Sequence, residues 1–123
     1  MINVVCGVIY QGEKFFIARR KTGIALEGKW EFPGGKIDND ESEECALNRE
    51  LNEELGMQVK VNNKLGEVIH DYSDITIKLI AYKCDFIAAT FALTDHDEYK
   101  WVCKQELINY DLADADKPFI DMI

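Results

Sequence analysis

The pattern of apolar and polar positions along the chain predicts two pairs of β-strands. Apolar runs rich in β-branched residues are typical of strands at residues 2–10 and 14–18, with a polar turn between them. Two longer stretches of the same kind lie at residues 59–71 and 75–86 and are joined by Tyr72-Ser73-Asp74. Connections this short join antiparallel neighbours, so each pair is expected to form a hairpin.

One long helix is predicted between the two pairs of strands, at residues 42–55. Ser42 is a suitable N-cap, and Gly56 directly follows the last helical residue, where glycine is favoured. An apolar stripe recurs at every fourth position along this segment: Leu47, Leu51 and Leu55. The helix is therefore expected to pack this stripe against the sheet.

The remaining elements are shorter. They are a polar loop at residues 19–29, an extended segment at 30–37 that Pro33-Gly34-Gly35 interrupts, a last strand at 98–103, and short helices at 105–109 and 114–122. Strand pairs around one long helix predict an α+β fold with helices packed on a mixed β-sheet. A chain of 123 residues is expected to form one domain, residues 1–123.

Composition narrows the classes of partner. Acidic residues outnumber basic ones by 23 to 14, which gives a formal net charge of -9. This balance disfavours a nucleic-acid polymer, because phosphate contacts require a basic surface. It favours a protein that binds divalent cations and meets an anionic small molecule through them.

Nothing in the sequence indicates an exported or membrane protein. The N-terminus lacks the basic region of a signal peptide, and no apolar run reaches the ~20 residues that cross a bilayer. Four cysteines show no metal-binding spacing, and each lies beside apolar residues: Cys6, Cys45, Cys84 and Cys103. We therefore expect a soluble cytoplasmic protein with no membrane partner, whose cysteines are reduced core residues.

Three carboxylates cluster on the predicted helix. Glu50, Glu53 and Glu54 stand at relative positions i, i+3 and i+4, on a face about 125° from the leucine stripe. Left unpaired, such like charges destabilise a helix, and Mg²⁺ resolves the conflict because it takes carboxylate oxygens together with water and phosphate. An acidic helix face is also commonly just exposed to solvent, so this face alone leaves both interpretations open.

The flanking residues favour the metal site. The stretch consists of Gly35, five residues, Glu41, seven residues and then Arg49-Glu50-Leu51-Asn52-Glu53-Glu54-Leu55-Gly56-Met57. It resembles the Nudix box, G-x5-E-x7-R-E-U-x-E-E-x-G-U with U apolar, at every specified position. The resemblance implies the Nudix fold, an α/β/α sandwich with a mixed β-sheet, and a hydrolase of phosphoanhydride bonds that depends on Mg²⁺ or on Mn²⁺.

The resemblance also implies roles for single residues. Gly34-Gly35 would turn the backbone tightly and bring a carbonyl, that of Gly35, close to the metal. Glu41 would support the metal ligands or simply be an exposed acid near the helix start. The metal would neutralise phosphate charge and activate a water for attack on phosphorus. The box residues expected to bind the metal are Glu50, Glu53 and Glu54, and these act in catalysis together with Arg49, which would hold a neighbouring carboxylate in place.

A further acidic position lies in the segment Asp95-His96-Asp97-Glu98-Tyr99-Lys100-Trp101. This segment resembles a family loop that carries an acidic residue six positions before a tryptophan. Asp95 matches by count and would complete the metal shell or act as general base, with Glu98 as the competing candidate. His96 and His70 are expected to make structural hydrogen bonds rather than to act in catalysis.

Two segments resemble the MutT branch of the family, which sanitises nucleotide pools: Ala18-Arg19-Arg20 and Trp30-Glu31-Phe32-Pro33-Gly34-Gly35-Lys36-Ile37. By this resemblance Arg20 would contact the phosphates of the substrate, and Lys36 would also bind substrate. Phe32 and Tyr72 would line the pocket for the base. The alternatives are a solvated arginine, a core phenylalanine and a tyrosine at the tip of a turn.

The tail, residues 112–120, resembles the CTP pyrophosphohydrolase subgroup. Asp116 falls where MutT itself has an asparagine that reads oxidised guanine, and an ionised aspartate only accepts hydrogen bonds. Asp116 would accept from the amino group of cytosine, or from the amino and ring N–H of guanine, although aspartate also suits the first turn of a helix. The expected reaction cleaves CTP, a 5-substituted dCTP or 8-oxo-dGTP to the monophosphate and pyrophosphate, as in nucleotide-pool sanitising linked to DNA repair.

The sequence leaves several alternatives open. ADP-ribose, diadenosine polyphosphates and RNA caps are other substrates of such hydrolases, and a regulator that keeps the fold without catalysis is another class. A calcium-binding module is disfavoured, because no D-x-D-x-D-G loop occurs. The base, the sugar, the number of metal ions, the phosphorus attacked and the choice between monomer and homodimer do not follow from the sequence.

Overall fold

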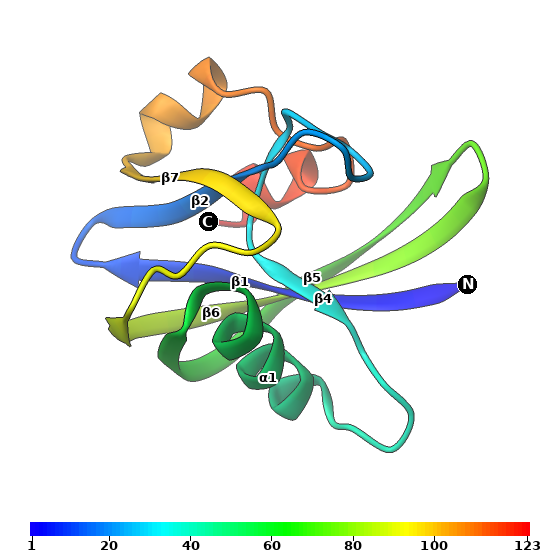
Figure 1. Ribbon diagram of the computed structural model, residues 1–123, viewed down its shortest axis with the longest axis horizontal. Coiled ribbons are helices and arrows are strands. Elements are labelled where there is room, and N and C mark those ends of the chain that lie inside the picture. Colours follow the sequence, from blue (N-terminus) through cyan, green and yellow to red (C-terminus); the bar gives the residue numbers. More distant parts are fainter.

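A mixed seven-stranded β-sheet forms the centre of the computed structural model, which describes residues 1–123 (Figure 1). The strands are β1 (Ile2–Gln11), β2 (Lys14–Arg20), β3 (Trp30–Glu31), β4 (Gly34–Lys36), β5 (Met57–Tyr72), β6 (Ile75–Ala89) and β7 (His96–Val102). The main path runs β3-β2-β1-β6-β5, while β4 pairs with β1 and β7 pairs with β2. The hairpins β1–β2 and β5–β6 are antiparallel, as predicted, whereas β1 and β6 pair in parallel.

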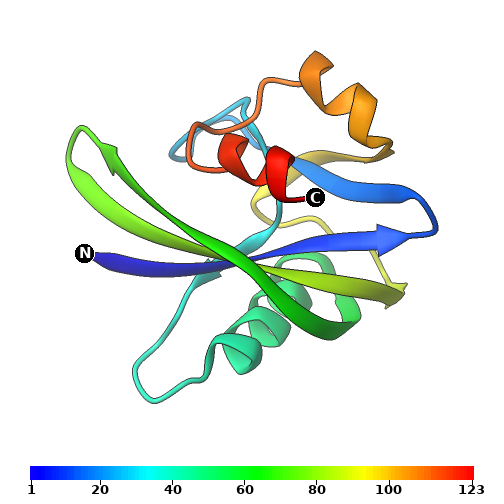
Figure 2. The same ribbon diagram turned by 180° about the vertical axis from the view of Figure 1, so that it is seen from behind.

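Helical segments cover both faces of this sheet. They are α1 (Glu43–Leu55) and the 3₁₀ helices η1 (Lys104–Asn109) and η2 (Lys117–Met122). α1 lies on one face, and both 3₁₀ helices lie on the other, as the two opposite views show (Figure 1, Figure 2). The α+β fold with a mixed sheet is thereby confirmed.

The bounds of several elements differ from the prediction. Residues 30–37 form two short strands, β3 and β4, on either side of Phe32-Pro33. The predicted C-terminal helices are 3₁₀ helices, and the second begins at Lys117 rather than at Asp114. β7 begins two residues early, at His96, because the register between β2 and β7 shifts there and brings His96 opposite Arg20.

Helix α1 has the ends that its sequence predicts. The Ser42 hydroxyl accepts a hydrogen bond from the Cys45 N–H at 3.1 Å, and Gly56 adopts a left-handed conformation with φ of 57°. The leucine stripe of α1 is fully buried. Of the three predicted metal ligands on α1, Glu54 is buried, with an exposed fraction of 8% for the residue, so a face simply exposed to solvent does not describe it.

Two apolar cores hold the layers together. The core on the α1 side contains the leucine stripe, with Phe16 and Met57 packed against it. The core on the opposite side contains Phe119 of η2 and Leu107 of η1, packed on side chains from β1, β2 and β6. Each face of the sheet therefore buries its own set of side chains, as a sandwich of three layers requires.

The cysteines are all unpaired, but they do not all belong to these cores. Cys6 and Cys84 are buried, Cys103 is half-buried, and Cys45 is exposed on α1. The prediction of a core residue is wrong for Cys45, because its position on α1 faces away from the leucine stripe, and for Cys103, which belongs to neither core. No helix of the protein is both long enough and apolar enough to cross a membrane.

Candidate active site

A cavity of about 710 Å³ lies where β1, β4, α1 and the end of the β5–β6 hairpin meet. It collects side chains from almost the whole length of the chain. The predicted site residues in its lining are Arg20, Phe32, Gly35, Lys36, Glu50, Glu54, Tyr72, Asp95 and Asp116. Arg49 and Glu53 lie outside this lining.

One group in the cavity is acidic and centres on Glu54. The Oε2 atom of this side chain is buried and has no hydrogen-bond partner. Burial raises the pKa of Glu54 to about 9, and the nearby carboxylates of Glu31, Glu50 and Asp95 add to the shift. Burial also raises the pKa of Glu50, although Arg49 acts against the shift. Such a group favours either a bound proton or a bound cation.

Arg49 forms the centre of a network of ion pairs beside this group. Its guanidinium donates to Glu41 at 2.7 Å, to Glu50 at 3.0 Å and to Glu53 at 3.2 Å. It also donates to the carbonyl of Lys36 at 3.1 Å. The two bonds from Arg49 to Glu41, followed by one from the Asp38 N–H, lower the pKa of Glu41 to about 2. Glu50 and Glu53 are thus paired, and Glu41 supports Arg49 rather than being a free surface acid.

The two glycines before the helix are required by close contacts. A Cβ atom on Gly34 would lie 1.9 Å from the Val5 carbonyl oxygen, and one on Gly35 would lie 2.3 Å from Cδ of Glu50. Both glycines lie in β4, and neither has a positive φ. The prediction of a tight turn at Gly34-Gly35 is therefore wrong, because the strand runs extended and presses against β1 and α1.

The loop before β7 places Asp95 rather than Glu98 at the acidic group. Asp95 lines the cavity beside Glu54, and the Asp95 carbonyl accepts from the Lys21 N–H at 3.0 Å. The Thr94 hydroxyl ties the loop to α1 by donating to the Glu54 carbonyl at 3.3 Å. Glu98 instead pairs with Arg19 at 3.3 Å and does not line the cavity.

A second group in the cavity centres on Asp116. Its Oδ2 accepts a hydrogen bond from the Phe32 N–H at 2.8 Å, and the Tyr72 hydroxyl accepts one from the Ala115 N–H at 3.1 Å. Burial, and then the charge of Glu31, raise the pKa of Asp116 well above its ordinary value. The Asp116 side chain makes no capping bond to η2, so the helix-turn alternative does not explain its burial.

For the other predicted residues, the alternatives to a role in substrate binding have different outcomes. Phe32 belongs to a core cluster and also lines the cavity, so both of its interpretations hold. Tyr72 ends β5 with its hydroxyl turned inward, not at the tip of the turn. Arg20 is not a solvated side chain, because its Nε donates to the Ala25 carbonyl at 2.6 Å and its Nη1 lies 3.5 Å from Glu31. Lys36 is exposed at the cavity rim.

Glu31 is the cavity residue whose role sequence reasoning missed. It contacts Arg20 and also lies 2.9 Å from Nε2 of His96, and its charge raises the pKa of both Glu54 and Asp116. It therefore stands between the acidic group and the Asp116 group. A signal was present, since a glutamate between Trp30 and Phe32 in an apolar segment is unusual on a buried strand.

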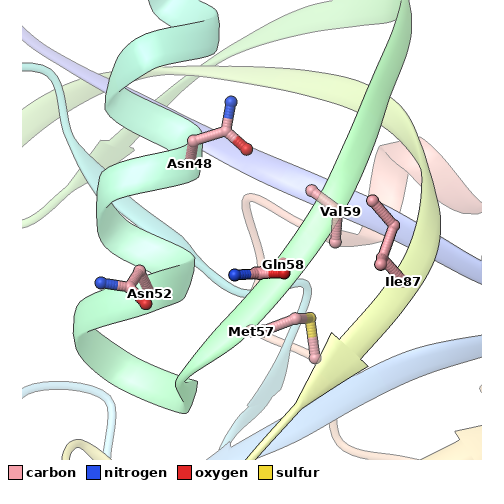
Figure 3. Close-up of a pocket in the computed structure, with 6 residues that line it drawn as sticks. All are labelled: Asn48, Asn52, Met57, Gln58, Val59 and Ile87. Atoms are coloured by element: carbon pink, nitrogen blue, oxygen red, sulfur yellow. The ribbon is translucent and has the colours of Figure 1, made fainter.

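A second depression, of about 490 Å³, carries no comparable chemistry (Figure 3). It lies between α1 and the strands β5 and β6, and Figure 3 shows the side chains of Asn48 and Asn52 along its helical wall. The residues that line it are Asn48, Asn52, Met57, Gln58, Val59 and Ile87. Since none of these is acidic or basic, this depression is no candidate for catalysis.

Comparison with known proteins gives the family. Residues 4–122 match the family described as NUDIX domain. The chain belongs to the Nudix hydrolase family. It is 35% identical over 121 residues to the CTP pyrophosphohydrolase of Escherichia coli, covering 98% of this chain and 90% of that protein. It is 42% identical over 79 residues to the 8-oxo-dGTP diphosphatase of Proteus vulgaris, covering 63% and 70%. The solved structure of a MutT protein from Methanosarcina mazei matches with a TM-score of 0.88 and 27% identity, covering 98% and 90%.

Nudix hydrolases generally need a divalent metal ion, and the cavity of this Nudix hydrolase fits one in its chemistry. The unpartnered Oε2 of Glu54 and the neighbouring carboxylates of Glu50 and Asp95 are hard oxygen donors of the kind that Mg²⁺ takes. In this arrangement no three acidic, histidine or cysteine side chains converge on one point. Glu53 in particular faces Arg49, with 57% of its side chain exposed.

Proposed function

We propose that this Nudix hydrolase uses Mg²⁺ to cleave a nucleoside triphosphate to the monophosphate and pyrophosphate in the cytoplasm. We propose CTP or a 5-substituted dCTP as its preferred substrate, ahead of 8-oxo-dGTP. The observation that carries this proposal is that one cavity holds both the box glutamates and the buried pair of Phe32 and Asp116. The names of the relatives, a CTP pyrophosphohydrolase and an 8-oxo-dGTP diphosphatase, support the same two substrate classes.

The metal ligands in this proposal come from the acidic group. Glu50, Glu53 and Glu54, with Asp95 and the Gly35 carbonyl, would hold Mg²⁺, or Mn²⁺ in its place. A bound divalent ion there supplies neutralisation of phosphate charge and activation of water. The ion pairs of Arg49 with Glu50 and Glu53 hold these two carboxylates in place on α1. To bind a metal in the cavity, the Glu53 side chain would have to break its ion pair with Arg49 and turn inward.

The chain's own residues supply the remaining chemistry. Arg20 lines the cavity and would face the phosphates. Asp95 is the general base of the proposal and takes a proton from the attacking water. The water oxygen bonds to one of the two phosphorus atoms of the bridge between the α- and β-phosphates, and the bond from that phosphorus to the bridging oxygen breaks. The group on the other side of the bridge, pyrophosphate or the nucleoside monophosphate, leaves with the electron pair.

Base preference in this proposal depends on the protonation of Asp116. Because burial and Glu31 raise the pKa of Asp116, a neutral acid there offers one donor and one acceptor. Cytosine presents the matching edge, a ring nitrogen that accepts and an amino group that donates. The amino and ring N–H of guanine are two donors and would require the ionised carboxylate, although the ring N–H and O6 of guanine also match a neutral acid. The neutral acid thus favours a cytosine nucleotide over a guanine nucleotide that presents its amino edge.

The test is pyrophosphate release from a nucleotide panel, with Mg²⁺ and again with EDTA. The panel holds CTP, dCTP, 5-methyl-dCTP, dGTP, 8-oxo-dGTP, ADP-ribose and a diadenosine polyphosphate. We expect Mg²⁺-dependent release from a cytosine triphosphate with the highest kcat/KM. Preference for 8-oxo-dGTP would overturn the base assignment alone. No release from any triphosphate by folded protein would overturn the proposed activity and favour a binding role.

A further inference from the structure

A β-bulge directs His96 into the interior of the protein. Along β7, Glu98 pairs with Arg19 of β2, but the next residue of β2, Arg20, pairs with His96 rather than with Asp97. An extra residue in one strand changes the direction in which the neighbouring side chains of that strand point. Asp97 is consequently free to pair with Arg19 at 2.8 Å on the outside, while the side chain of His96 is fully buried.

The buried imidazole makes a single hydrogen bond, to Glu31. Its Nε2 lies 2.9 Å from Oε2 of Glu31, while Nδ1 has no partner. Because a carboxylate oxygen only accepts, Nε2 is the donor of this bond. An aromatic core residue would fill the same space without leaving a ring nitrogen unsatisfied, so packing alone does not account for a histidine at this position.

Glu31, which contacts His96, also contacts Arg20. Both carboxylate oxygens of Glu31 lie 3.5 Å from Nη1 of Arg20. The Arg20 guanidinium is fixed at a second point by the bond from its Nε to the Ala25 carbonyl. Strands β3, β2 and β7 are neighbours in the sheet, which is why three residues far apart in the sequence form one chain of contacts.

We propose that His96 is a positioning residue that acts through Glu31 to hold the Arg20 guanidinium at the cavity wall, facing the nucleotide phosphates. This inference rests on the proposed function, since it assigns Arg20 to the phosphates. Without the hydrogen bond from Nε2, the Glu31 carboxylate is free to rotate away, and Arg20 loses one of its two fixed points. Affinity for the phosphates then falls, whichever base the nucleotide carries.

The matched variants His96→Asn and His96→Gln test the proposal. The amide nitrogen of glutamine reaches the place of Nε2, whereas that of asparagine reaches only the place of Nδ1. For both CTP and dGTP we expect H96N to raise KM roughly tenfold and H96Q to stay within about threefold of wild type. The dissociation constant of α,β-methylene-CTP, measured by calorimetry in Mg²⁺ buffer, should follow the same order. If wild type binds this analogue but cleaves no triphosphate, the proposed function fails while the test of His96 stands.

A double-mutant cycle with Arg20→Lys distinguishes positioning from packing. If His96 acts through Arg20, H96N adds little to the KM of R20K. The proposal is overturned if H96N and H96Q are equally impaired, if the loss is confined to one base, or if the effects of H96N and R20K add in full. Should H96N not fold, Glu31→Gln replaces it in the cycle, and additivity of E31Q with R20K overturns the proposal in the same way.

Discussion

Two buried carboxyl groups, Glu54 and Asp116, give the cavity its chemistry at the scale of single residues. Burial is the largest cause of the raised pKa of each, and Glu31 is the second. Their hydrogen bonding differs, because Oε2 of Glu54 has no partner whereas Oδ2 of Asp116 accepts from the Phe32 N–H. We interpret Glu54 as a ligand for a cation, and Asp116 as a group that recognises the base and is held in a fixed orientation.

The raised pKa of Glu54 predicts how stability depends on pH in the absence of metal. The folded-state pKa of about 9 exceeds the ordinary value of 4.5, so the neutral carboxyl stabilises the folded protein fully below pH 4.5. This contribution is lost as pH rises through about 9. In EDTA at pH 9 we expect the free energy of unfolding of Glu54→Gln to exceed that of wild type by roughly 1–3 kcal/mol, and its melting temperature to be higher accordingly. At pH 4 we expect the two proteins to melt at similar temperatures. Parallel melting curves for the two proteins across this range would contradict the burial of a titrating Glu54.

The protonation of Asp116 predicts how substrate affinity depends on pH. As pH rises through its raised pKa, Asp116 loses the proton that it would donate to cytosine, so the KM of wild type for CTP should rise. Asp116→Asn keeps one donor and one acceptor at every pH, and its KM should stay flat. Asp116→Ala should raise KM at every pH while leaving the Mg²⁺ dependence unchanged. Identical KM profiles against pH for wild type and D116N would remove Asp116 from base recognition.

At the scale of elements, local patterns predicted more than long-range contacts did. The leucine stripe, Ser42 and Gly56 fixed the helix to within one residue, because caps and periodicity are properties of neighbouring positions. The parallel pairing of β1 with β6 had no local signal, and neither did the bulge that turns His96 inward. Contacts of this kind depend on which strands become neighbours, which a single sequence does not encode locally.

The same limit applied to the candidate site. Motif spacing and the resemblance to the family indicated nine of the 23 residues that line the cavity, including Glu54, Asp95 and Asp116. They did not indicate that Phe32 and Asp116, 84 positions apart, would share a hydrogen bond. They also did not indicate Glu31, whose importance comes from its position between two groups rather than from its own spacing.

The close packing of β4 predicts different outcomes for its two glycines. In Gly34→Ala the new Cβ meets the backbone of β1, with the Val5 oxygen at 1.9 Å, and the strands must separate. In Gly35→Ala the new Cβ meets the end of the Glu50 side chain, which can rotate away. We expect G34A to lose roughly 1–3 kcal/mol of stability or more. We expect G35A to fold but to need more Mg²⁺ for half-maximal rate, because Glu50 is displaced.

Urea unfolding and Mg²⁺ titration of both variants check this difference. Gly12→Ala serves as a control for glycine replacement in general, since a Cβ there meets nothing within 4 Å, although its φ of 64° carries some strain. Equal losses of stability in G34A and G35A would show that the Glu50 side chain is not free to move.

At the scale of the whole molecule, the proposed function assigns phosphate chemistry and base recognition to two parts of one cavity. α1 and the loop before β7 bring the acidic group from one face of the sheet, whereas the segment before η2 brings Asp116 from the other. With a net charge of -9, the protein has little general attraction for polyanions, so a triphosphate would depend on Arg20 and on a bound cation.

The most direct measurement is product analysis by ion-exchange chromatography after incubation of CTP with wild type, Glu54→Gln and Glu44→Gln in Mg²⁺. Glu44 is an exposed acid on the same helix and does not line the cavity, so E44Q is the matched control. We predict CMP and pyrophosphate from wild type and from E44Q, a rate lower by roughly 100-fold or more in folded E54Q, and no reaction in EDTA. CDP and phosphate as products, or an undiminished rate in E54Q, would contradict the proposed reaction.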